Sequence, residues 1–299
     1  MKVLVCDKTE KECIEQMRAA GLTVDTNFEI TPEDLMTVLP AYDVAVVRSR
    51  TKIRQPLIDV CPNLKLIVRG GVGLDTIDVE YARGKGITVQ NTPLASSDSV
   101  AELAIGYMFM LARSLYKASA TMKAEKWEKK AFEGDEIGGK TLGLIGVGNI
   151  GKAVIKRAVA LGMTVVAYDP YVKEVAGATL VSLDELLAQA DYISLHLPKT
   201  KESANMVGAE QFAKMKTGVR IINCARGGII NEDALYEALT GGKVAAAALD
   251  VFVEEPPTDW KLLKLDNVIG SPHIGAATKE GQGRVGAEVA QIVIDFAKK

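Results

Sequence analysis

One glycine-rich segment limits the possible folds of this chain more than any other feature. A short apolar run, residues 141–145, leads directly into Gly146, Gly148 and Gly151, and a helix-like stretch follows over residues 150–161. In that order the first glycine permits a tight turn, the second lets a ligand approach the backbone, and the third lets the helix pack close to the strand. The free N–H groups at the start of such a helix attract phosphate. The segment therefore predicts a pyrophosphate cradle for a dinucleotide.

An acidic residue supports this interpretation. The next apolar run, residues 164–168, ends at Asp169. A carboxylate at that place accepts hydrogen bonds from ribose hydroxyls and repels the 2′-phosphate of NADP, so NAD is the expected cofactor. The alternative is a glycine turn that binds no ligand. It is disfavoured because strand, turn, helix and acid all occur in the required order.

The remaining chain alternates short apolar runs with amphipathic stretches, a pattern typical of parallel sheets covered on both faces. The proline-free apolar segment 96–118 predicts one long helix that links two such series, and a last helix is expected over roughly residues 278–296. We therefore expect an α/β protein with two doubly wound, Rossmann-like or flavodoxin-like parallel-sheet domains and a cleft between them. The predicted strands are residues 2–6, 44–47, 64–68, 87–89, 141–145, 164–168, 192–195, 220–223, 245–249 and 268–269.

Composition excludes several classes of function. The net charge of -2 gives no basic excess for nucleic acid and no acidic tail for a basic partner. The longest apolar stretch, residues 103–112, is too short to span a bilayer, and Asp7 comes too early for a signal peptide. The four cysteines show no C-x-x-C spacing, so we expect neither disulfides nor a metal site, and a cytoplasmic location.

Three polar side chains follow apolar runs in the second half of the chain, namely Arg226, Glu255 and His273. Open α/β sheets bind ligands at the carboxyl ends of their strands. An imidazole can take a proton from a substrate hydroxyl, a carboxylate beside it raises its pKa and fixes its tautomer, and a guanidinium can bind a carboxylate through two hydrogen bonds. Each has a plainer alternative: a structural histidine, a solvated loop acid equivalent to Glu254, and a surface arginine.

The other histidine, His196, also follows a predicted strand. We interpret it as part of the wall of the cofactor pocket, because no acid follows it closely. A catalytic role for His196 is the less favoured alternative.

A basic run follows the predicted strand 44–47. Its cations alternate as Arg48, Arg50, Lys52 and Arg54, so they would share one side of an extended segment. Such a row suits a phosphate, although a solvated run of charges is the alternative.

The chain resembles the D-2-hydroxyacid dehydrogenase family over almost its whole length, most closely its phosphoglycerate-oxidising members. The resemblance is carried, besides the glycine segment, by residues 70–75, 91–93, 101–102, 223–228, 249–252, 254–257 and 271–278, and by the match of Arg48, Ser49 and Arg50 to a phosphate-binding run. Ser96 departs from the asparagine of many relatives, and because the chain stops at Lys299 we expect no C-terminal regulatory domain and no serine feedback.

The resemblance implies a substrate-binding domain of residues 1–93 plus 283–299, an NAD-binding Rossmann domain of residues 94–282, and a homodimer. It implies NAD-dependent oxidation of 3-phosphoglycerate to 3-phosphohydroxypyruvate, the first step of serine biosynthesis. The expected catalytic residues are Arg226, Glu255 and His273. The expected cofactor-binding residues are Gly146, Gly148, Asn149, Ile150, Gly151, Asp169, His196, Leu197, Pro198, Cys224, Ala225, Asp250 and Ala276. The expected substrate-binding residues are Arg48, Ser49, Arg50, Gly71, Val72, Gly73, Arg226 and His273.

Two alternatives stay open at this point. A glyoxylate or hydroxypyruvate reductase of the same family would not need the basic run at Arg48 and Arg50. An NAD-sensing binding protein would keep the fold without turnover, but it would not need the trio of arginine, glutamate and histidine.

Overall fold

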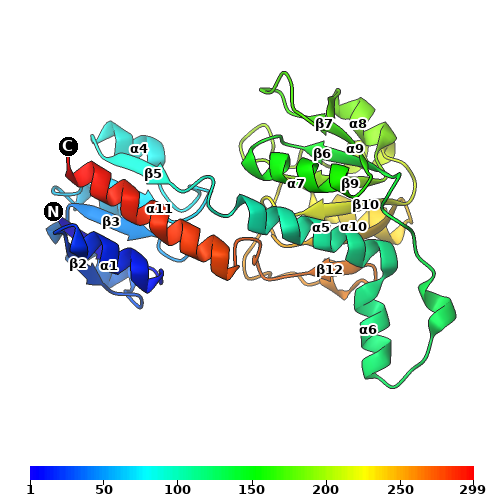
Figure 1. The fold of residues 1–299 in the computed structure, drawn as a ribbon, viewed down its shortest axis with the longest axis horizontal. Helices are drawn as coiled ribbons and strands as arrows, with labels where there is room; N and C mark the ends of the chain where they lie inside the picture. Colours follow the sequence, from blue (N-terminus) through cyan, green and yellow to red (C-terminus); the bar gives the residue numbers. More distant parts are fainter. The chain divides into compact units, whose positions relative to one another are not determined.

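The computed structural model describes all 299 residues and groups them into two compact units (Figure 1). The first unit joins residues 1–97 to residues 276–299, so it contains both chain ends, and the second unit comprises residues 98–275. The division into a substrate domain and an NAD domain, with boundaries after residues 93 and 282, stays a prediction.

The first unit is built on a parallel five-stranded sheet in the order β2-β1-β3-β4-β5. The strands are β1 (Lys2–Val5), β2 (Thr23–Thr26), β3 (Val44–Val47), β4 (Leu66–Arg69) and β5 (Thr88–Asn91). The helices are α1 (Lys11–Ala19), α2 (Pro32–Val38), α3 (Gln55–Asp59), α4 (Val79–Gly84) and α11 (Lys279–Ala297). Every residue of β3 is buried, because helices cover both faces of the sheet.

The C-terminal helix is an integral part of this unit. Val285, Val289 and Val293 of α11 share a buried apolar cluster with Cys13 and Met17 of α1. The two helices approach closely, since a β-carbon at Gly286 would lie 3.3 Å from the β-carbon of Cys13. Burial of this apolar seam holds the last helix against the first.

The second unit is built on a parallel seven-stranded sheet in the order β12-β11-β10-β9-β6-β7-β8. The strands are β6 (Thr141–Ile145), β7 (Thr164–Tyr168), β8 (Thr179–Leu180), β9 (Tyr192–Leu195), β10 (Val219–Asn223), β11 (Val244–Leu249) and β12 (Val268–Gly270). The helices are α5 (Ser97–Arg113), α6 (Leu115–Lys123), α7 (Asn149–Ala160), α8 (Leu183–Gln189), α9 (Ala209–Lys214) and α10 (Glu232–Thr240). Short 3₁₀ turns cover Leu39–Ala41, Lys129–Phe132 and Leu262–Lys264.

Two apolar layers cover this second sheet. Helices α5 and α7 enclose one layer, and α8, α9 and α10 enclose the other. The strand order reverses between β6 and β9, and ligands of doubly wound sheets bind at that point. The two parallel α/β sheets confirm the predicted fold class.

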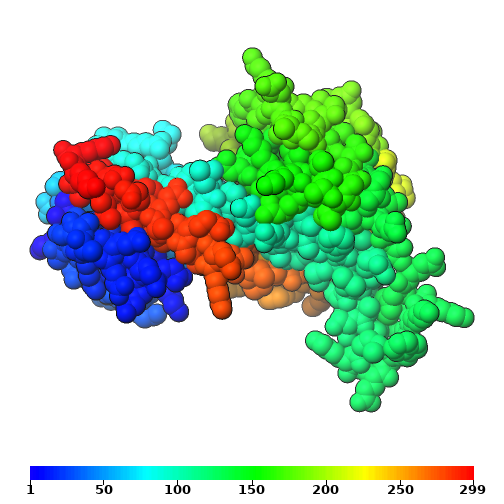
Figure 2. All heavy atoms as spheres, viewed as in Figure 1, coloured from blue at the N-terminus to red at the C-terminus, as the bar shows by residue number.

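The predicted single helix over residues 96–118 is wrong. Helix α5 ends at Arg113, Ser114 takes a left-handed conformation with φ of 46°, and α6 starts at Leu115. The chain that returns after α6 binds the end of α5, since the Asp135 N–H donates to the Ala112 carbonyl at 3.0 Å. Figure 2 shows α6 and the residues after it standing out from the rest of the second unit.

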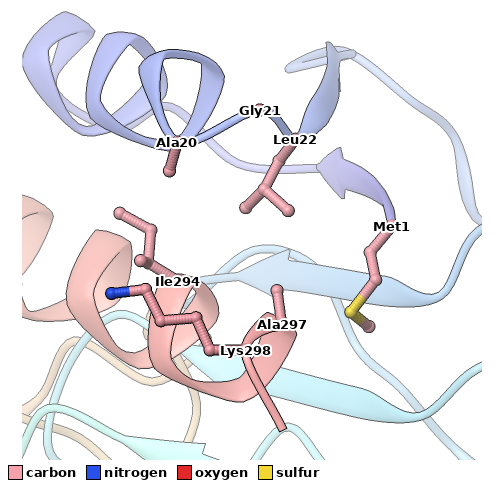
Figure 3. A pocket seen from close by; sticks show the side chains of 7 residues that line it. All are labelled: Met1, Ala20, Gly21, Leu22, Ile294, Ala297 and Lys298. Carbon is pink, nitrogen blue, oxygen red and sulfur yellow. The ribbon is translucent and has the colours of Figure 1, made fainter.

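No helix combines the length and the apolar character that crossing a membrane requires. The first unit contains a small hollow of about 240 Å³ beside the chain ends (Figure 3). It is lined by Met1, Leu22, Ile294 and Lys298, together with neighbouring small residues. None of the predicted site residues lines it, so this hollow is separate from the chemistry considered below.

Candidate active site

The glycine segment forms a tight loop between β6 and α7. Gly146 has φ of 95°, and a β-carbon there would lie 2.5 Å from the carbonyl oxygen of His196. A β-carbon at Gly151 would lie 2.3 Å from the Gly146 carbonyl oxygen, so only glycine lets the helix pack this close. Gly148 is the N-cap residue of α7 and has open space around it. The loop and the helix start therefore leave room for a pyrophosphate, as a dinucleotide requires.

Asp169 lies at the end of β7, next to this loop. One carboxylate oxygen accepts the Val147 N–H at 2.8 Å and the other accepts the Tyr171 N–H at 2.9 Å. These bonds fix the carboxylate beside the glycine loop while leaving further lone pairs for ribose hydroxyls. The residues present therefore fit NAD, and the negative charge disfavours the 2′-phosphate of NADP.

His196 lies at the end of β9, beneath the glycine loop. Its side chain is buried, and Nε2 lies 2.8 Å from the Ser194 hydroxyl, whereas Nδ1 has no hydrogen-bond partner. Burial lowers the pKa of His196 to about 3, so the ring is neutral near pH 7. Leu197 lies beside Gly146. The places of His196 and Leu197 beside the glycine loop support their assignment to the wall of the cofactor site. The burial and neutral state of His196 argue against it as the acid–base group.

Another pair of residues has the geometry of an acid–base centre. His273 Nδ1 lies 2.7 Å from Glu255 Oε2, and the other carboxylate oxygen accepts the Phe252 N–H at 3.2 Å. Burial pushes the pKa of Glu255 up, but the hydrogen bond and charge of His273 outweigh it and hold that pKa below its ordinary value. Glu254 instead accepts a bond from Thr258, so Glu255 is the carboxylate that pairs with the histidine.

Arg226 lies in a turn that follows β10. The Asn223 side chain fixes this turn by donating to the Arg226 carbonyl at 3.0 Å and accepting from the Ala225 N–H at 3.0 Å. A β-carbon at Gly227 would overlap the Phe252 carbonyl, so the turn packs tightly on the segment that leads to Glu255. The positive charge of Arg226 also helps to lower the pKa of Glu255.

The trio therefore comes from three adjacent strand ends. Arg226 follows β10, Glu255 follows β11 and His273 follows β12, and these strands are neighbours in the sheet. Parallel strands place their carboxyl ends on one edge, which is why sequence positions far apart meet here. The arrangement offers a proton acceptor, a carboxylate that orients it and a cation for an anionic substrate group.

Asp250 and Ala276 differ from the other predicted cofactor residues. The Asp250 side chain is buried, and its oxygens accept the Ser271 hydroxyl, the Ile274 N–H at 2.8 Å and the Gly275 N–H at 2.7 Å. The hydrogen-bond partners of the Asp250 side chain therefore all lie in the turn that carries His273. Ala276 lies at the start of the returning part of the first unit, where its carbonyl accepts from Gln282 at 2.6 Å.

In the first unit, Asp7 organises the basic run after β3. This carboxylate is buried after β1 and accepts bonds from the Arg48 N–H at 2.5 Å, from both the N–H and the hydroxyl of Thr51, and from Arg50 Nε at 3.2 Å. Arg50 also donates to the carbonyls of Ile30 and Cys6. Sequence reasoning did not identify Asp7, although it follows a strand end as the other site residues do.

The expectation that the four alternating cations share one side applied to an extended segment, and that condition is not met. Arg50 reaches back to Asp7, while Arg54 forms an ion pair with Asp78 at 2.8 Å. The reason is that the segment is a loop, in which the alternation of an extended strand does not apply. A further cation lies beside this run, because Arg69 at the end of β4 donates to the Ser49 hydroxyl at 3.3 Å. Its place at a strand end is the signal that could have found it.

The glycine turn after β4 is also fixed by hydrogen bonds. Gly71 has φ of 142°, and its N–H donates to the Thr92 hydroxyl at 2.8 Å. The Val72 carbonyl accepts from the Asn91 side chain at 2.5 Å. The turn is therefore held to the end of β5 on both sides of Val72.

A Rossmann sheet with a glycine loop, an acid at the end of the second strand and a histidine–carboxylate pair is typical of a nicotinamide-dependent dehydrogenase. The model of the D-isomer specific 2-hydroxyacid dehydrogenase NAD binding domain matches residues 105–275. The chain belongs to the D-isomer specific 2-hydroxyacid dehydrogenase family and is an NAD-dependent oxidoreductase.

Three known proteins illustrate the similarity. The hydroxypyruvate reductase of Thermotoga maritima is 50% identical over 97% of this chain and 96% of its own length. The D-3-phosphoglycerate dehydrogenase of Archaeoglobus fulgidus is 48% identical over 100% of this chain, which spans only 58% of that relative. The structure of D-lactate dehydrogenase from Aquifex aeolicus, complexed with NAD and lactic acid, matches with a TM-score of 0.88 and 32% identity, covering 100% of this chain and 96% of that one.

Proposed function

We propose that this enzyme oxidises 3-phosphoglycerate reversibly to 3-phosphohydroxypyruvate, in the cytoplasm, as the first step of serine biosynthesis. The observation that carries the proposal is the bond from Arg69, at the end of β4, to the Ser49 hydroxyl, which follows the neighbouring strand β3. Arg48, next to Ser49 in the chain, donates from its guanidinium to the Lys8 carbonyl at 3.2 Å and keeps further donors for a ligand. Phosphate is bound in proteins by such clusters of arginine and hydroxyl groups. The four free, buried cysteines are consistent with a reducing compartment.

The second unit supplies the acid–base chemistry of this proposal. With its Nδ1 proton donated to Glu255, the His273 ring presents Nε2 as a proton acceptor for the hydroxyl of the substrate. Glu255 then stabilises the imidazolium that forms, and Arg226 binds the substrate carboxylate. The glycine loop and Asp169 would hold NAD, which when bound would supply the hydride acceptor. In the reverse direction the protonated histidine returns the proton to the carbonyl oxygen.

The first unit supplies groups for the phosphate of the substrate and further donors for its carboxylate. We assign the phosphate to Arg48, Ser49 and Arg69. The role of Arg50 shifts in this proposal, because its guanidinium already bonds Asp7 and two carbonyls and so maintains the loop. For the carboxylate we assign the N–H groups of Val72 and Gly73, since the Gly71 N–H is bonded to Thr92.

A hydroxypyruvate reductase of the same family is the second candidate. It is favoured by the relative of that name in Thermotoga maritima, which matches this chain over nearly the whole length of both proteins. Such an enzyme needs no phosphate cluster, so it predicts that the cationic residues can be removed at little cost. A glyoxylate reductase makes the same prediction, and a protein that only senses NAD predicts no turnover.

The test compares NADH oxidation with 3-phosphohydroxypyruvate, hydroxypyruvate and glyoxylate in the parent, Arg48→Ala and Arg69→Ala enzymes. We expect each substitution to raise KM for the phosphorylated substrate by roughly tenfold or more and to leave the other two substrates nearly unchanged. Arg54→Ala is the matched control, because Arg54 is engaged by Asp78. Equal or better rates on the unphosphorylated acids, or no selective effect of the arginines, would refute the phosphate assignment.

A homodimer completes the proposal. Four large apolar side chains on and after α5 are exposed, namely Phe109, Leu115, Met122 and Trp127, the last with 79% of its surface accessible. An exposed apolar set of this kind marks an interaction surface, and α6 projects from the unit that carries it. We expect a second copy of the chain to cover these residues. Sedimentation equilibrium of the parent and of Trp127→Glu tests this, since a monomeric parent excludes the dimer.

A further inference from the structure

A chain of hydrogen-bonded hydroxyl groups leads from helix α5 to the turn that carries His273. Tyr107 of α5 is buried, and its hydroxyl is hydrogen-bonded to the Ser271 hydroxyl just after β12. Ser271 in turn is hydrogen-bonded to the carboxylate of Asp250, just after β11. Helix α5 and the loops that follow β11 and β12 therefore meet through two polar contacts in the second unit; α5 and β12 are labelled in Figure 1.

The direction of these bonds follows from the chemistry of the groups. The Ser271 hydroxyl donates its proton to the carboxylate of Asp250. The Ser271 oxygen then remains as an acceptor, and the Tyr107 hydroxyl must donate to it. Burial raises the pKa of Tyr107 to about 12, so the phenol keeps the proton that this bond needs.

Asp250 joins this chain to the histidine turn at several points. Its carboxylate accepts the N–H groups of Ile274 and Gly275, and its backbone carbonyl accepts the His273 N–H at 2.9 Å. His273 itself has φ of 53°, a conformation that is uncommon for a residue with a side chain. The turn is thus fixed on both sides of the histidine.

The same strand end also carries Glu255. Asp250 and Glu255 both follow β11, whereas His273 follows β12, so the 2.7 Å contact between Glu255 and His273 depends on how the two loops are held together. Asp250 is the residue of the first loop that binds the second. Any group that fixes the Asp250 carboxylate therefore also fixes the acid–base pair.

We propose that Tyr107 and Ser271 are positioning residues for the reaction, which act through Asp250 to hold His273 against Glu255. This inference rests on the proposed role of His273 as the acid–base group. Neither hydroxyl has to touch the substrate or the cofactor. Tyr107 thereby makes helix α5, which otherwise supplies core packing, a part of the catalytic geometry.

The first test is Tyr107→Phe, which removes one hydroxyl and retains the buried ring. We expect kcat to fall roughly tenfold, since small displacements of an acid–base group are costly, while the Kd for NADH stays the same. We also expect the pH profile of kcat/KM to shift, because the pairing of Glu255 with His273 is loosened. Tyr116→Phe is the matched control, since the Tyr116 hydroxyl, on the following helix α6, donates to the Asp266 carbonyl at 2.8 Å.

The second test uses Ser271. Ser271→Ala should reproduce the loss seen in Tyr107→Phe, and Ser271→Thr, which keeps a hydroxyl, should restore most of kcat. The double variant Tyr107→Phe/Ser271→Ala should be no slower than Ser271→Ala alone, because both substitutions break one chain of bonds. If Tyr107→Phe and Ser271→Ala lower the melting temperature but leave kcat and the pH profile like those of Tyr116→Phe, the hydroxyls are structural only and the inference fails.

A parallel assay of His273→Ala separates this inference from the proposed function. If His273→Ala retains turnover, the acid–base assignment itself fails. If His273→Ala loses turnover while the hydroxyl variants keep parental kinetics, only the positioning role of Tyr107 and Ser271 is refuted.

Discussion

Acidification should weaken the fold of the second unit through one buried residue, His196. In the folded protein burial lowers the pKa of this histidine from 6.5 to about 3, so it stays neutral where the unfolded chain binds a proton. The unfolded state then binds more protons between these two values, and the free energy of unfolding falls as the pH falls. The contribution is complete above pH 6.5 and is lost progressively below it.

The magnitude follows from that shift. Each pH unit below the unfolded pKa costs about 1.4 kcal/mol per proton, so lowering the pH from 7 to 5 should remove about 2 kcal/mol through His196 alone. A variant without a titrating group at this position, His196→Gln, should lack this component. The difference in unfolding free energy between parent and variant should therefore change by about 2 kcal/mol over the same pH interval.

Urea unfolding at a series of pH values measures this difference. Both tryptophans, Trp127 and Trp260, lie in the second unit with His196, so tryptophan fluorescence reports on the relevant part of the chain. Carboxylates that titrate in this range affect parent and variant alike and cancel in the comparison. If the two stability curves run parallel between pH 7 and 5, His196 is not a neutral buried group, and the argument against its acid–base role falls with it.

Three further predictions concern the site. Gly151→Ala should lower the free energy of unfolding by about 1–3 kcal/mol in thermal or urea unfolding, because its β-carbon would collide with the Gly146 carbonyl. Gly148 has open space around it, so Gly148→Ala should fold normally and lose only NADH affinity in a fluorescence titration. Asp169→Asn keeps an acceptor for the Val147 N–H but removes the charge, so the preference for NAD over NADP in kcat/KM should fall roughly tenfold, and an unchanged ratio would contradict its assigned role. Glu255→Gln should lower kcat by roughly 10²-fold, and a kcat equal to that of the parent would exclude the support of His273 by Glu255. The substitution should also remove a contribution to the free energy of unfolding. The parent has this contribution above about pH 4.5 and loses it as the pH falls through the lowered folded pKa of Glu255.

The local sequence was sufficient to predict a strand, turn or helix wherever the residues of that element alone determine its structure. The glycine segment had to be a strand, turn and helix, because no other residue type fits the close approaches at Gly146 and Gly151. Fully buried strands such as β3 and β9 were identified from their apolar runs. The edge strands β2 and β8 were missed, since a strand with one neighbour is mostly exposed and carries little apolar pattern.

The sequence by itself determined the fold class, the cofactor and the set of candidate site residues, because short local patterns mark strand ends and glycine turns. Only the tertiary structure decided which of them meet. It paired Glu255 rather than Glu254 with His273 and turned Arg50 toward Asp7. It also placed Arg69 beside Ser49 and linked Tyr107 through Ser271 to Asp250. It also broke the linking helix at Ser114, where the returning chain binds the end of α5. These contacts join residues from separate strands and helices, and their partners are fixed by how the sheet orders its strands rather than by spacing along the chain.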